Sequence, residues 1–272
     1  MSDFLKTMAS ESAARASAAQ GSVRSADLDL QIVPLVLGTF DLIAEIKNRS
    51  PSEGALVAAS SGRSQRAARY VDGGAAAISV LTEPTQFAGE LGHLEEVVRA
   101  VESSPVPVMR KDFLVDPIQI LEARAAGASG VLLIMTMLSD RQVDDMLHCA
   151  YEHAMFVLLE SFDEEDLRRS SDLLDEARHK EQAESGKLLF GVNTRDLRTL
   201  HVDPERLKTL GARLPQGVAC VAESGLHNGQ DAAAVAGWGY RLALVGTALM
   251  RAPDPGQLIQ EMLEAGRERR AA

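Results

Sequence analysis

The sequence predicts an α/β protein, a single (β/α)8 barrel (TIM barrel) with an extra helical segment at the N-terminus. Its 272 residues suit a fold that typically takes about 250 residues. From residue 42 onward, eight short apolar runs alternate with longer amphipathic segments, and they recur about every 23 to 35 residues, the length of one strand–helix unit. The runs lack polar alternation, which indicates strands covered on both faces, as in a parallel sheet.

The eight runs are the predicted strands of the barrel. They cover residues 42–46, 77–81, 106–109, 131–135, 156–159, 189–192, 219–222 and 242–245. A doubly wound open sheet could hold the same alternation, but no G-x-G-x-x-G follows the first run and no G-x-x-x-x-G-K-[ST] occurs anywhere, which favours the barrel. We expect one domain, with residues 1–41 as an N-terminal helical extension and residues 42–272 as the barrel.

Helical periodicity and capping residues occupy the segments between the strands. After Ser139, apolar side chains recur at helical spacing, namely at Val143, Met146, Leu147, Ala150, Tyr151 and Ala154. Residues 91–101 follow the same pattern. Asp203 and Asp254 each precede a proline, which is typical of a helix start. The acidic residues 163–166 also suit a helix N-terminus.

Two segments lie outside the regular alternation. Phe4, Leu5 and Met8 with alanine-rich spacing predict the extra N-terminal helix. Residues 177–187 are polar, with Glu and Lys mixed, and they indicate a solvated extension between the fifth and sixth units.

The composition disfavours several classes of partner. The chain has 39 acidic residues against 28 Lys and Arg, a net charge of −11, and nucleic-acid binding needs a basic face. The longest apolar runs are far shorter than the roughly 18 residues of a membrane-spanning helix, and residues 1–10 carry no apolar signal-peptide core. We therefore expect a cytoplasmic protein with no nucleic-acid or membrane partner.

Cysteines and histidines predict neither a disulfide framework nor a metal site. Cys149 and Cys220 are too few for such a framework and are expected to be small buried side chains. His148 and His153 are five residues apart, so they do not share a helix face. The remaining histidines are expected at the surface or in loops, at positions 93, 179, 201 and 227. We expect no metal and no cofactor.

The residues that follow the strands are the candidates for catalysis, because active sites of this fold lie at the carboxyl ends of the strands. Glu45 and Lys47 share a face of the first strand. The ends of strands three, five and seven add one charged group each, at Lys111, Glu160 and Glu223. Such charges are costly if they only fill a barrel, which favours a catalytic role.

The ends of strands seven and eight carry the signature of a phosphate site. They read Ser224-Gly225 and Gly246-Thr247. Loops at these two positions often bind phosphate through backbone N–H groups and a helix N-terminus. Glycine permits close approach of the backbone, and the hydroxyl groups add donors.

These motifs together resemble those of the indole-3-glycerol-phosphate synthase family. The resemblance runs from about residue 40 to residue 263 and rests on motifs in the family's order. They are Glu45-Ile46-Lys47, Ser50-Pro51-Ser52, Ser79-Val80-Leu81-Thr82-Glu83, Lys111-Asp112-Phe113, Gly191-Val192-Asn193 with Arg195-Asp196, and Glu223-Ser224-Gly225. The Phe4-Leu5 stretch also resembles that family's extra helix, which helps to cover the substrate.

The resemblance implies a cofactor-free ring closure in tryptophan biosynthesis. The substrate would be 1-(2-carboxyphenylamino)-1-deoxyribulose 5-phosphate, and the products indole-3-glycerol phosphate, CO2 and water. Lys111 would be the general acid of ring closure, and Lys47 would pair with the substrate carboxylate and assist departure of the hydroxyl. Glu45 and Glu160 would share the acid–base work of dehydration, and which carboxylate is the base stays open.

The resemblance also implies roles in substrate binding. Asn193 and Glu223 would position the reacting centre, and Arg195 would support Asn193 and the anionic substrate. The phosphate would be held by Ser50, Ser224, Gly225, Gly246 and Thr247. Phe113 and Leu133 would line the apolar slot for the anthranilate ring.

Three positions depart from the commonest family pattern. Glu53 stands where lysine is frequent, Thr194 where a second asparagine is common, and Thr247 where serine often occurs. Thr247 keeps a hydroxyl, whereas Glu53 adds negative charge near the phosphate site. Because no proposed catalytic group is lost, we expect activity, with altered substrate affinity as a consequence of these changes.

Two alternative functions are weighed against this one. Another phosphate-binding barrel enzyme, similar to phosphoribosylanthranilate isomerase or tryptophan synthase α, would not need Lys47 and Lys111 together. A catalytically silent barrel that binds a partner protein would have no use for so many buried charges. We expect a sugar-phosphate substrate and a monomer or weak homo-oligomer.

Overall fold

The computed structural model describes residues 2–50, 54–55, 62–197, 202–203 and 205–272 and contains a closed barrel of eight parallel strands. The order around the barrel is β1-β10-β9-β8-β7-β6-β5-β4. The strands are β1 (Asp41–Ile46), β4 (Ala77–Leu81), β5 (Val108–Lys111), β6 (Gly130–Ile134), β7 (Phe156–Ser161), β8 (Leu188–Asn193), β9 (Cys220–Glu223) and β10 (Leu242–Val245). The predicted fold class is therefore confirmed, and each predicted strand differs from the observed one by two residues or fewer at either end.

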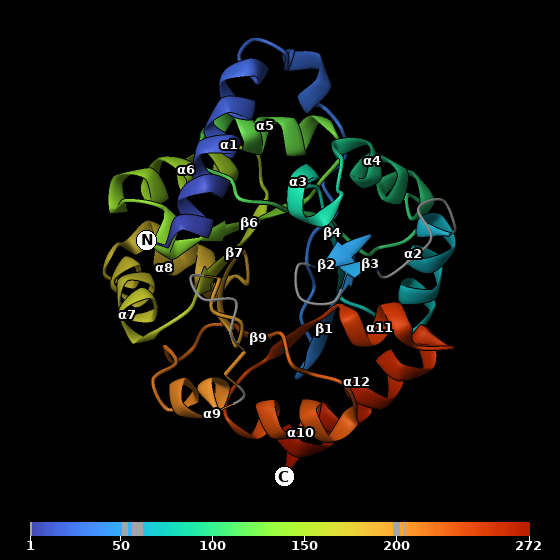
Figure 1. The fold of residues 1–272 in the computed structure, drawn as a ribbon. Coiled ribbons are helices and arrows are strands. Elements are labelled where there is room, and N and C mark those ends of the chain that lie inside the picture. The colour runs from blue at the N-terminus through green and yellow to red at the C-terminus, as the bar shows by residue number, and fades with distance from the viewer. Residues whose placement is uncertain (1, 51–53, 56–61, 198–201, 204) are drawn as a thin grey trace.

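Helices surround the barrel and alternate with its strands (Figure 1). They are α1 (Asp3–Ala19), α2 (Arg63–Asp72), α3 (Pro84–Phe87), α4 (Leu91–Ala100), α5 (Pro117–Ala125), α6 (Asp140–Glu152), α7 (Glu164–Asp172), α8 (Ala177–Glu184), α9 (Arg206–Gly211), α10 (Gly229–Gly237), α11 (Thr247–Arg251) and α12 (Pro255–Ala271). Short 3-10 turns cover Ser25–Leu28, Met135–Met137 and Leu173–Asp175, and a small antiparallel pair, β2 (Arg49–Ser50) and β3 (Gly54–Ala55), follows β1. No helix among the described residues is both long and apolar enough to span a bilayer.

The barrel strands are buried, except for half-buried Lys111 at the end of β5, because helices cover them outside and side chains fill the barrel inside. The burial pattern of β1, β4, β6, β7 and β8 contains no exposed position, as expected of parallel strands. The ring closes where β1 pairs with both β4 and β10. Every strand therefore ends at the same rim.

The predicted N-terminal helix is present and packs against the barrel beside α5 (Figure 1). Leu5 and Met8 are buried, and the Arg15 guanidinium is 2.7 Å from Asp112 Oδ1, just after β5. Gln119 Nε2 of α5 donates to Ser12 Oγ at 2.8 Å. Helix α1 is thus held by polar contacts to α5 and to the residue that follows β5.

Three local predictions differ from the structure. The segment at residues 177–187 is not merely a solvated extension, because α8 occupies it and buries His179 and Ala183 against the molecule. The helix after Ser139 ends at Glu152, since Ala154 adopts φ 55°, outside helical geometry. Helix α9 begins at Arg206 and not directly after Asp203, whereas Pro204 lies outside the described residues. Asp254-Pro255 does start a helix, as predicted.

Candidate active site

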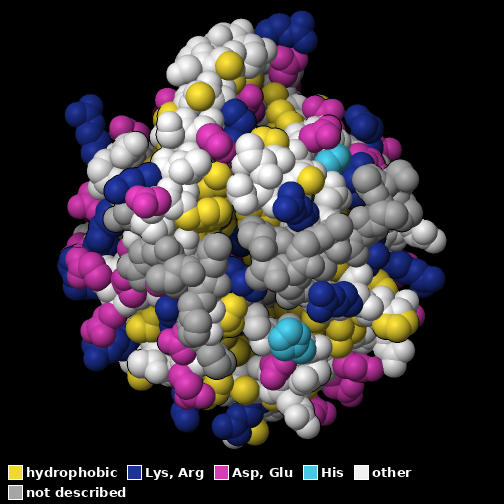
Figure 2. Space-filling model, viewed as in Figure 1, with side chains coloured by type: hydrophobic (Ala, Val, Ile, Leu, Met, Phe, Trp, Pro, Cys, Tyr) yellow, Lys and Arg dark blue, Asp and Glu magenta, His cyan; other side chains and the backbone are white. Residues whose placement is uncertain are grey.

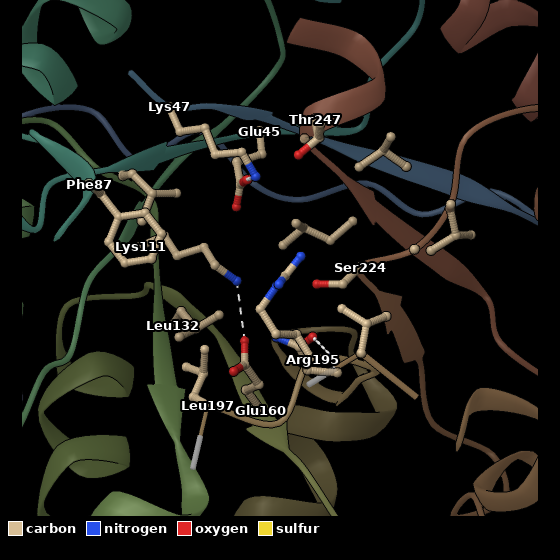
Figure 3. Close-up of a pocket in the computed structure, with 18 of the residues that line it drawn as sticks. Glu45, Lys47, Phe87, Lys111, Leu132, Glu160, Arg195, Leu197, Ser224 and Thr247 are labelled. Carbon is tan, nitrogen blue, oxygen red and sulfur yellow. Dashed lines mark hydrogen bonds and ion pairs between the residues drawn. The ribbon is translucent and has the colours of Figure 1, made fainter. Parts of the chain in front are cut away.

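The rim formed by the carboxyl ends of the strands encloses a cavity of about 260 Å³. Most predicted site residues line it: Glu45, Lys47, Lys111, Phe113, Glu160, Asn193, Arg195, Ser224, Gly225, Gly246 and Thr247. Figure 3 shows Lys47, Lys111 and Arg195 extending into the same space from three different strand ends. Charged groups that are far apart in the sequence therefore converge on one cavity, as the strand-end rule predicts.

Lys111 lies at the centre of a buried charge cluster. Its Nζ is 3.0 Å from Glu223 Oε2 and 3.2 Å from Glu160 Oε2. Both carboxylates are almost fully buried, at 0% and 1% side-chain exposure. Glu160 lines the cavity together with Lys111, whereas Glu223 contacts Lys111 without being part of the cavity lining.

This cluster shifts the protonation equilibria of its members. Burial and the neighbouring charge of Glu160 raise the pKa of Glu223 well above the ordinary carboxyl value. Burial alone would lower the pKa of Lys111, but the carboxylates outweigh it and raise that pKa. Two carboxyl groups compete for one ammonium group, so the cluster favours the charged form of Lys111 and the protonated form of Glu223.

A second pair stands across the cavity. Lys47 Nζ is 2.7 Å from Glu45 Oε1, which confirms that the two side chains share a face of β1. Burial opposes ionisation of Glu45, but Lys47 and then Lys111 outweigh it and lower its pKa. Glu45 is thus an ionised carboxylate within reach of an ammonium group, a pair that can take up and donate protons.

Two glycines make room for these carboxylates. A Cβ at Gly191 would collide with Glu223 Oε1, and a Cβ at Gly246 would collide with Glu45 Oε1 and lie 2.9 Å from Lys47 Nζ. Gly246 lines the cavity as predicted, yet its contact is with the Glu45–Lys47 pair. The sequence predicts that the backbone at Gly246 lies close to a phosphate group, but it does not predict this contact with Glu45 and Lys47.

The turn after β9 carries unusual backbone geometry. Ser224 has φ 67° and Gly225 has φ 74°, the left-handed region that non-glycine residues seldom occupy. Strain of this kind costs on the order of 1–3 kcal/mol and occurs mainly at functional sites. Figure 3 shows the Ser224 hydroxyl directed into the cavity, with Thr247 on the neighbouring strand end.

Asn193 is oriented by the residue two positions further on. Its Oδ1 accepts a hydrogen bond of 2.9 Å from the Arg195 backbone N–H, while the Arg195 guanidinium extends into the cavity (Figure 3). The predicted support of Asn193 by Arg195 thus comes from the backbone.

The apolar wall of the cavity differs from the prediction at one position. Leu133 is buried but does not line the cavity, because alternation along β6 directs Leu132 and Ile134 inward instead. Phe113 does line it and contacts Phe87 and Phe4, with ring centroids 6.3 Å and 6.0 Å away. The slot therefore draws on α1 and α3 as well as on the barrel.

Several lining residues carried no functional signal in the sequence. They include Phe87, Leu132, Ile134, Leu197, Leu226, His227 and Leu244. Strict alternation from the strand ends identifies Leu132 and Ile134, whereas Phe87 stands on a short helix within a loop and has no periodic neighbour. Ser50 belongs to β2, but nothing is described of its side chain, and Pro51, Ser52 and Glu53 lie outside the described residues.

The fold and the site together define a (β/α)8-barrel enzyme that performs acid–base chemistry at the carboxyl rim of its strands. Residues 19–262 match the family model described as indole-3-glycerol phosphate synthase. The chain belongs to the indole-3-glycerol phosphate synthase family. This membership confirms the predicted class, a decarboxylating lyase of tryptophan biosynthesis.

Similar proteins support this assignment. The chain is 42% identical over 225 residues to a protein named indole-3-glycerol phosphate synthase from Parafrankia sp. (strain EAN1pec), covering 83% of this chain and 78% of that one. It is 41% identical over 230 residues to a protein of the same name from Methanopyrus kandleri, covering 83% and 84%. Among solved structures, 3-hexulose-6-phosphate synthase from Salmonella typhimurium superposes with a TM-score of 0.61 at 16% identity, covering 85% of this chain and 100% of that one. That likeness shows the fold alone.

Proposed function

We propose that this chain closes the indole ring of 1-(2-carboxyphenylamino)-1-deoxyribulose 5-phosphate, giving indole-3-glycerol phosphate, CO2 and water. The observation that carries the proposal is the Lys111 ammonium, held at 3.0 and 3.2 Å from two buried carboxyl groups at the edge of an apolar slot. A general acid in a dry, preorganised site stabilises developing negative charge on oxygen.

Ring closure would use Lys111 first. The ring carbon that bears the carboxylate attacks the sugar ketone carbon, a C–C bond forms, and the ketone electron pair moves to oxygen. Lys111 donates a proton to that oxygen. The carboxylate then leaves as CO2, and its bonding pair restores the aromatic ring.

Dehydration would follow in the same cavity. The nitrogen lone pair expels the hydroxyl, which leaves as water after protonation by an acid, and a base removes the remaining ring proton. Lys47, paired at 2.7 Å with Glu45, would pair with the substrate carboxylate and assist departure of the hydroxyl. Glu45 and Glu160 would supply the acid–base groups, Asn193 would position the reacting centre, and Glu223 would act through its contact with Lys111.

The remaining residues would bind the substrate. Phe113 with Leu132 and Ile134 would form the slot for the aromatic ring. Ser224, Gly225, Gly246 and Thr247 would hold the phosphate, with Ser50 on the adjoining segment, and Arg195 would supply charge for an anionic substrate. The cytoplasmic location and the monomeric or weakly oligomeric state remain predictions.

The decisive experiment is a fluorescence assay for indole formation. Purified enzyme is mixed with the carboxyphenylamino sugar phosphate, and indole-3-glycerol phosphate is verified by mass spectrometry together with release of CO2. Turnover at catalytic enzyme concentrations is expected. Absence of product at micromolar enzyme overturns the proposal.

The phosphate assignment has its own test. Ser224→Glu places a carboxylate beside the substrate phosphate, and like charges about 4 Å apart repel by roughly 1 to 4 kcal/mol. We expect KM to rise about 5-fold or more. Ser224→Asn is the matched control, since asparagine tolerates a left-handed backbone without adding charge. An unchanged KM for Ser224→Glu would place the phosphate elsewhere.

A further inference from the structure

His179 is a fully buried histidine with an unpartnered nitrogen. It lies on α8, and its side chain has 0% exposure. Its Nε2 has no hydrogen-bond partner. Two carboxylate oxygens face this nitrogen, Asp144 Oδ1 at 3.3 Å and Glu176 Oε2 at 3.7 Å. The three donor atoms all lie within 4.8 Å of one another.

These separations are longer than a good charge-assisted hydrogen bond. Such bonds from nitrogen to a carboxylate are about 2.7–2.9 Å long, shorter than either distance at His179. In its neutral form, an imidazole offers a lone pair on one ring nitrogen. Two ligands of one tetrahedral zinc ion, each about 2.1 Å from the metal, stand about 3.4 Å apart.

We propose that Asp144, Glu176 and His179 bind one divalent transition-metal ion of the zinc class. Imidazole nitrogen with carboxylate oxygen is a donor set that such ions accept, and two carboxylates balance the double positive charge. Asp144 and Glu176 are 43% and 69% exposed, so the ion can enter from solvent and water can complete its coordination. The three ligands come from two segments, since Asp144 lies on α6 and Glu176 directly precedes α8 (Figure 1).

Neighbouring side chains hold the ligands in place. Tyr151 Oη is 3.2 Å from His179 Nδ1, so in the metal-binding tautomer the Nδ1–H donates to the tyrosine oxygen. His148 Nδ1 is 2.8 Å from the backbone oxygen of Asp144 and 2.9 Å from its Oδ1, so a second imidazole lies next to that carboxylate. Such outer contacts are typical of metal sites, where they fix the tautomer and the ring orientation.

The ion would fasten α8 to α6 on the outside of the barrel. None of the three ligands lines the catalytic cavity, so the expected effect of the metal is on stability and not on turnover. The sequence predicted no metal site because Asp144 and His179 belong to different helices, and no spacing rule joins them.

Binding of Zn²⁺ to the full-length enzyme tests the proposal. After dialysis against a chelator, isothermal titration with ZnCl2 is expected to give one saturable site per chain, and the same site loaded with Co²⁺ is expected to show visible absorption of a tetrahedral N/O complex. Asp144→Asn removes one ligand and should weaken binding at least 10-fold. The melting temperature should rise with zinc in the wild type and not in Asp144→Asn.

Two further variants control the experiment. Asp145→Asn removes the adjacent exposed carboxylate and should leave the affinity unchanged. His179→Gln removes the nitrogen ligand. Because His179 is buried, this variant can fail to fold, and Asp144→Asn, at a partly exposed position, then still tests the site. No saturable zinc binding, or equal losses in Asp144→Asn and Asp145→Asn, overturns the proposal.

Discussion

At the scale of single residues, the site depends on proton sharing among buried groups. Lys111 is held between Glu160 and Glu223, and only one of these two carboxyl groups needs to be ionised to balance the ammonium. Burial makes a second buried negative charge costly. The arrangement therefore favours the protonated form of Lys111 and raises the pKa of Glu223.

Lys111→Ala tests the role of the lysine directly. Loss of a general acid typically lowers the rate by about 10²- to 10⁴-fold, so we expect kcat to fall at least about 100-fold with a smaller change in KM. Steady-state kinetics provides the measurement. Lys208→Ala, an exposed lysine on α9, should retain wild-type activity. A near-native kcat for Lys111→Ala would remove the lysine from the chemistry.

Glu223→Gln tests the protonation state through stability. A carboxyl group whose pKa is raised on folding binds more protons in the folded than in the unfolded state. Wild-type stability therefore falls as pH rises from the ordinary carboxyl pKa of 4.5 towards the raised pKa of Glu223. Glutamine mimics the neutral acid, so the melting temperature of the variant relative to the wild type should increase from about pH 5 to pH 8. Parallel melting curves over this range would contradict the assignment.

At the scale of secondary-structure elements, strand ends and helix α1 position the groups that we propose for catalysis. The end of β10 must pass close to Glu45 and Lys47, and the residue there, Gly246, has no side chain to obstruct them. Helix α1 contacts the end of β5 through the Arg15–Asp112 ion pair. Asp112 immediately follows Lys111 in the chain, and its Oδ2 also accepts a hydrogen bond of 2.7 Å from Thr82 Oγ1.

Gly246→Ala tests the close approach at β10. Its φ of −119° is accessible to alanine, so the expected effect comes from the collision of the new Cβ with the side chains of Glu45 and Lys47. We expect kcat to fall about 10-fold or more, because a misplacement of about 1 Å can cost on the order of 10²-fold. Gly92→Ala is the matched control, since nothing lies within 4 Å of its Cβ position. Equal kcat values for Gly246→Ala and Gly92→Ala would show that a Cβ at position 246 does not disturb Glu45 and Lys47.

Arg15→Ala tests the tether of α1. Asp112 is 1% exposed and would lose one of its two guanidinium partners. Hydrogen bonds to charged groups contribute about 1.5–3 kcal/mol, and we expect a loss of that size in the free energy of unfolding, together with faster proteolysis after α1. Chemical denaturation and limited digestion check this. Arg24→Ala, which breaks an exposed pair with Asp27, should change stability by less than about 0.5 kcal/mol.

At the scale of the whole molecule, the negative charge and the anionic substrate are compatible because they occupy different places. Acidic and basic side chains are intermingled over the outer helices on the face shown in Figure 2. The cavity lining instead brings Lys47, Lys111 and Arg195 together with three carboxylates, Glu45, Asp112 and Glu160, so it carries no excess of negative charge. A net charge of −11 therefore describes the helical exterior and says little about the ligand.

The sequence predicts the barrel well and the site in part, for physical reasons. Strands covered on both faces are continuously apolar, so they can be identified from the sequence alone. The polar residues that end each apolar run can be identified in the same way. Phe87 and His179 could not be predicted in this way. Only tertiary contacts bring Phe87 to the cavity from its loop, and only tertiary contacts bury His179, which lies on a polar helix. The prediction that Leu133 lines the cavity is wrong, because neighbouring residues of a strand point to opposite faces of the sheet.

Closure of the barrel between β1 and β10 also bears on how the protein is made. Roughly 200 residues separate these two strands, which at 5–20 residues per second take about 10–40 s to synthesise. During that time β1 has one unpaired edge, and Glu45 lacks the neighbouring strand end that encloses it. A nascent chain without β10 is therefore inactive and exposes a strand edge that other chains can pair with. The ring closes only when nearly the whole sequence is present, so the last strand completes both the fold and the active site.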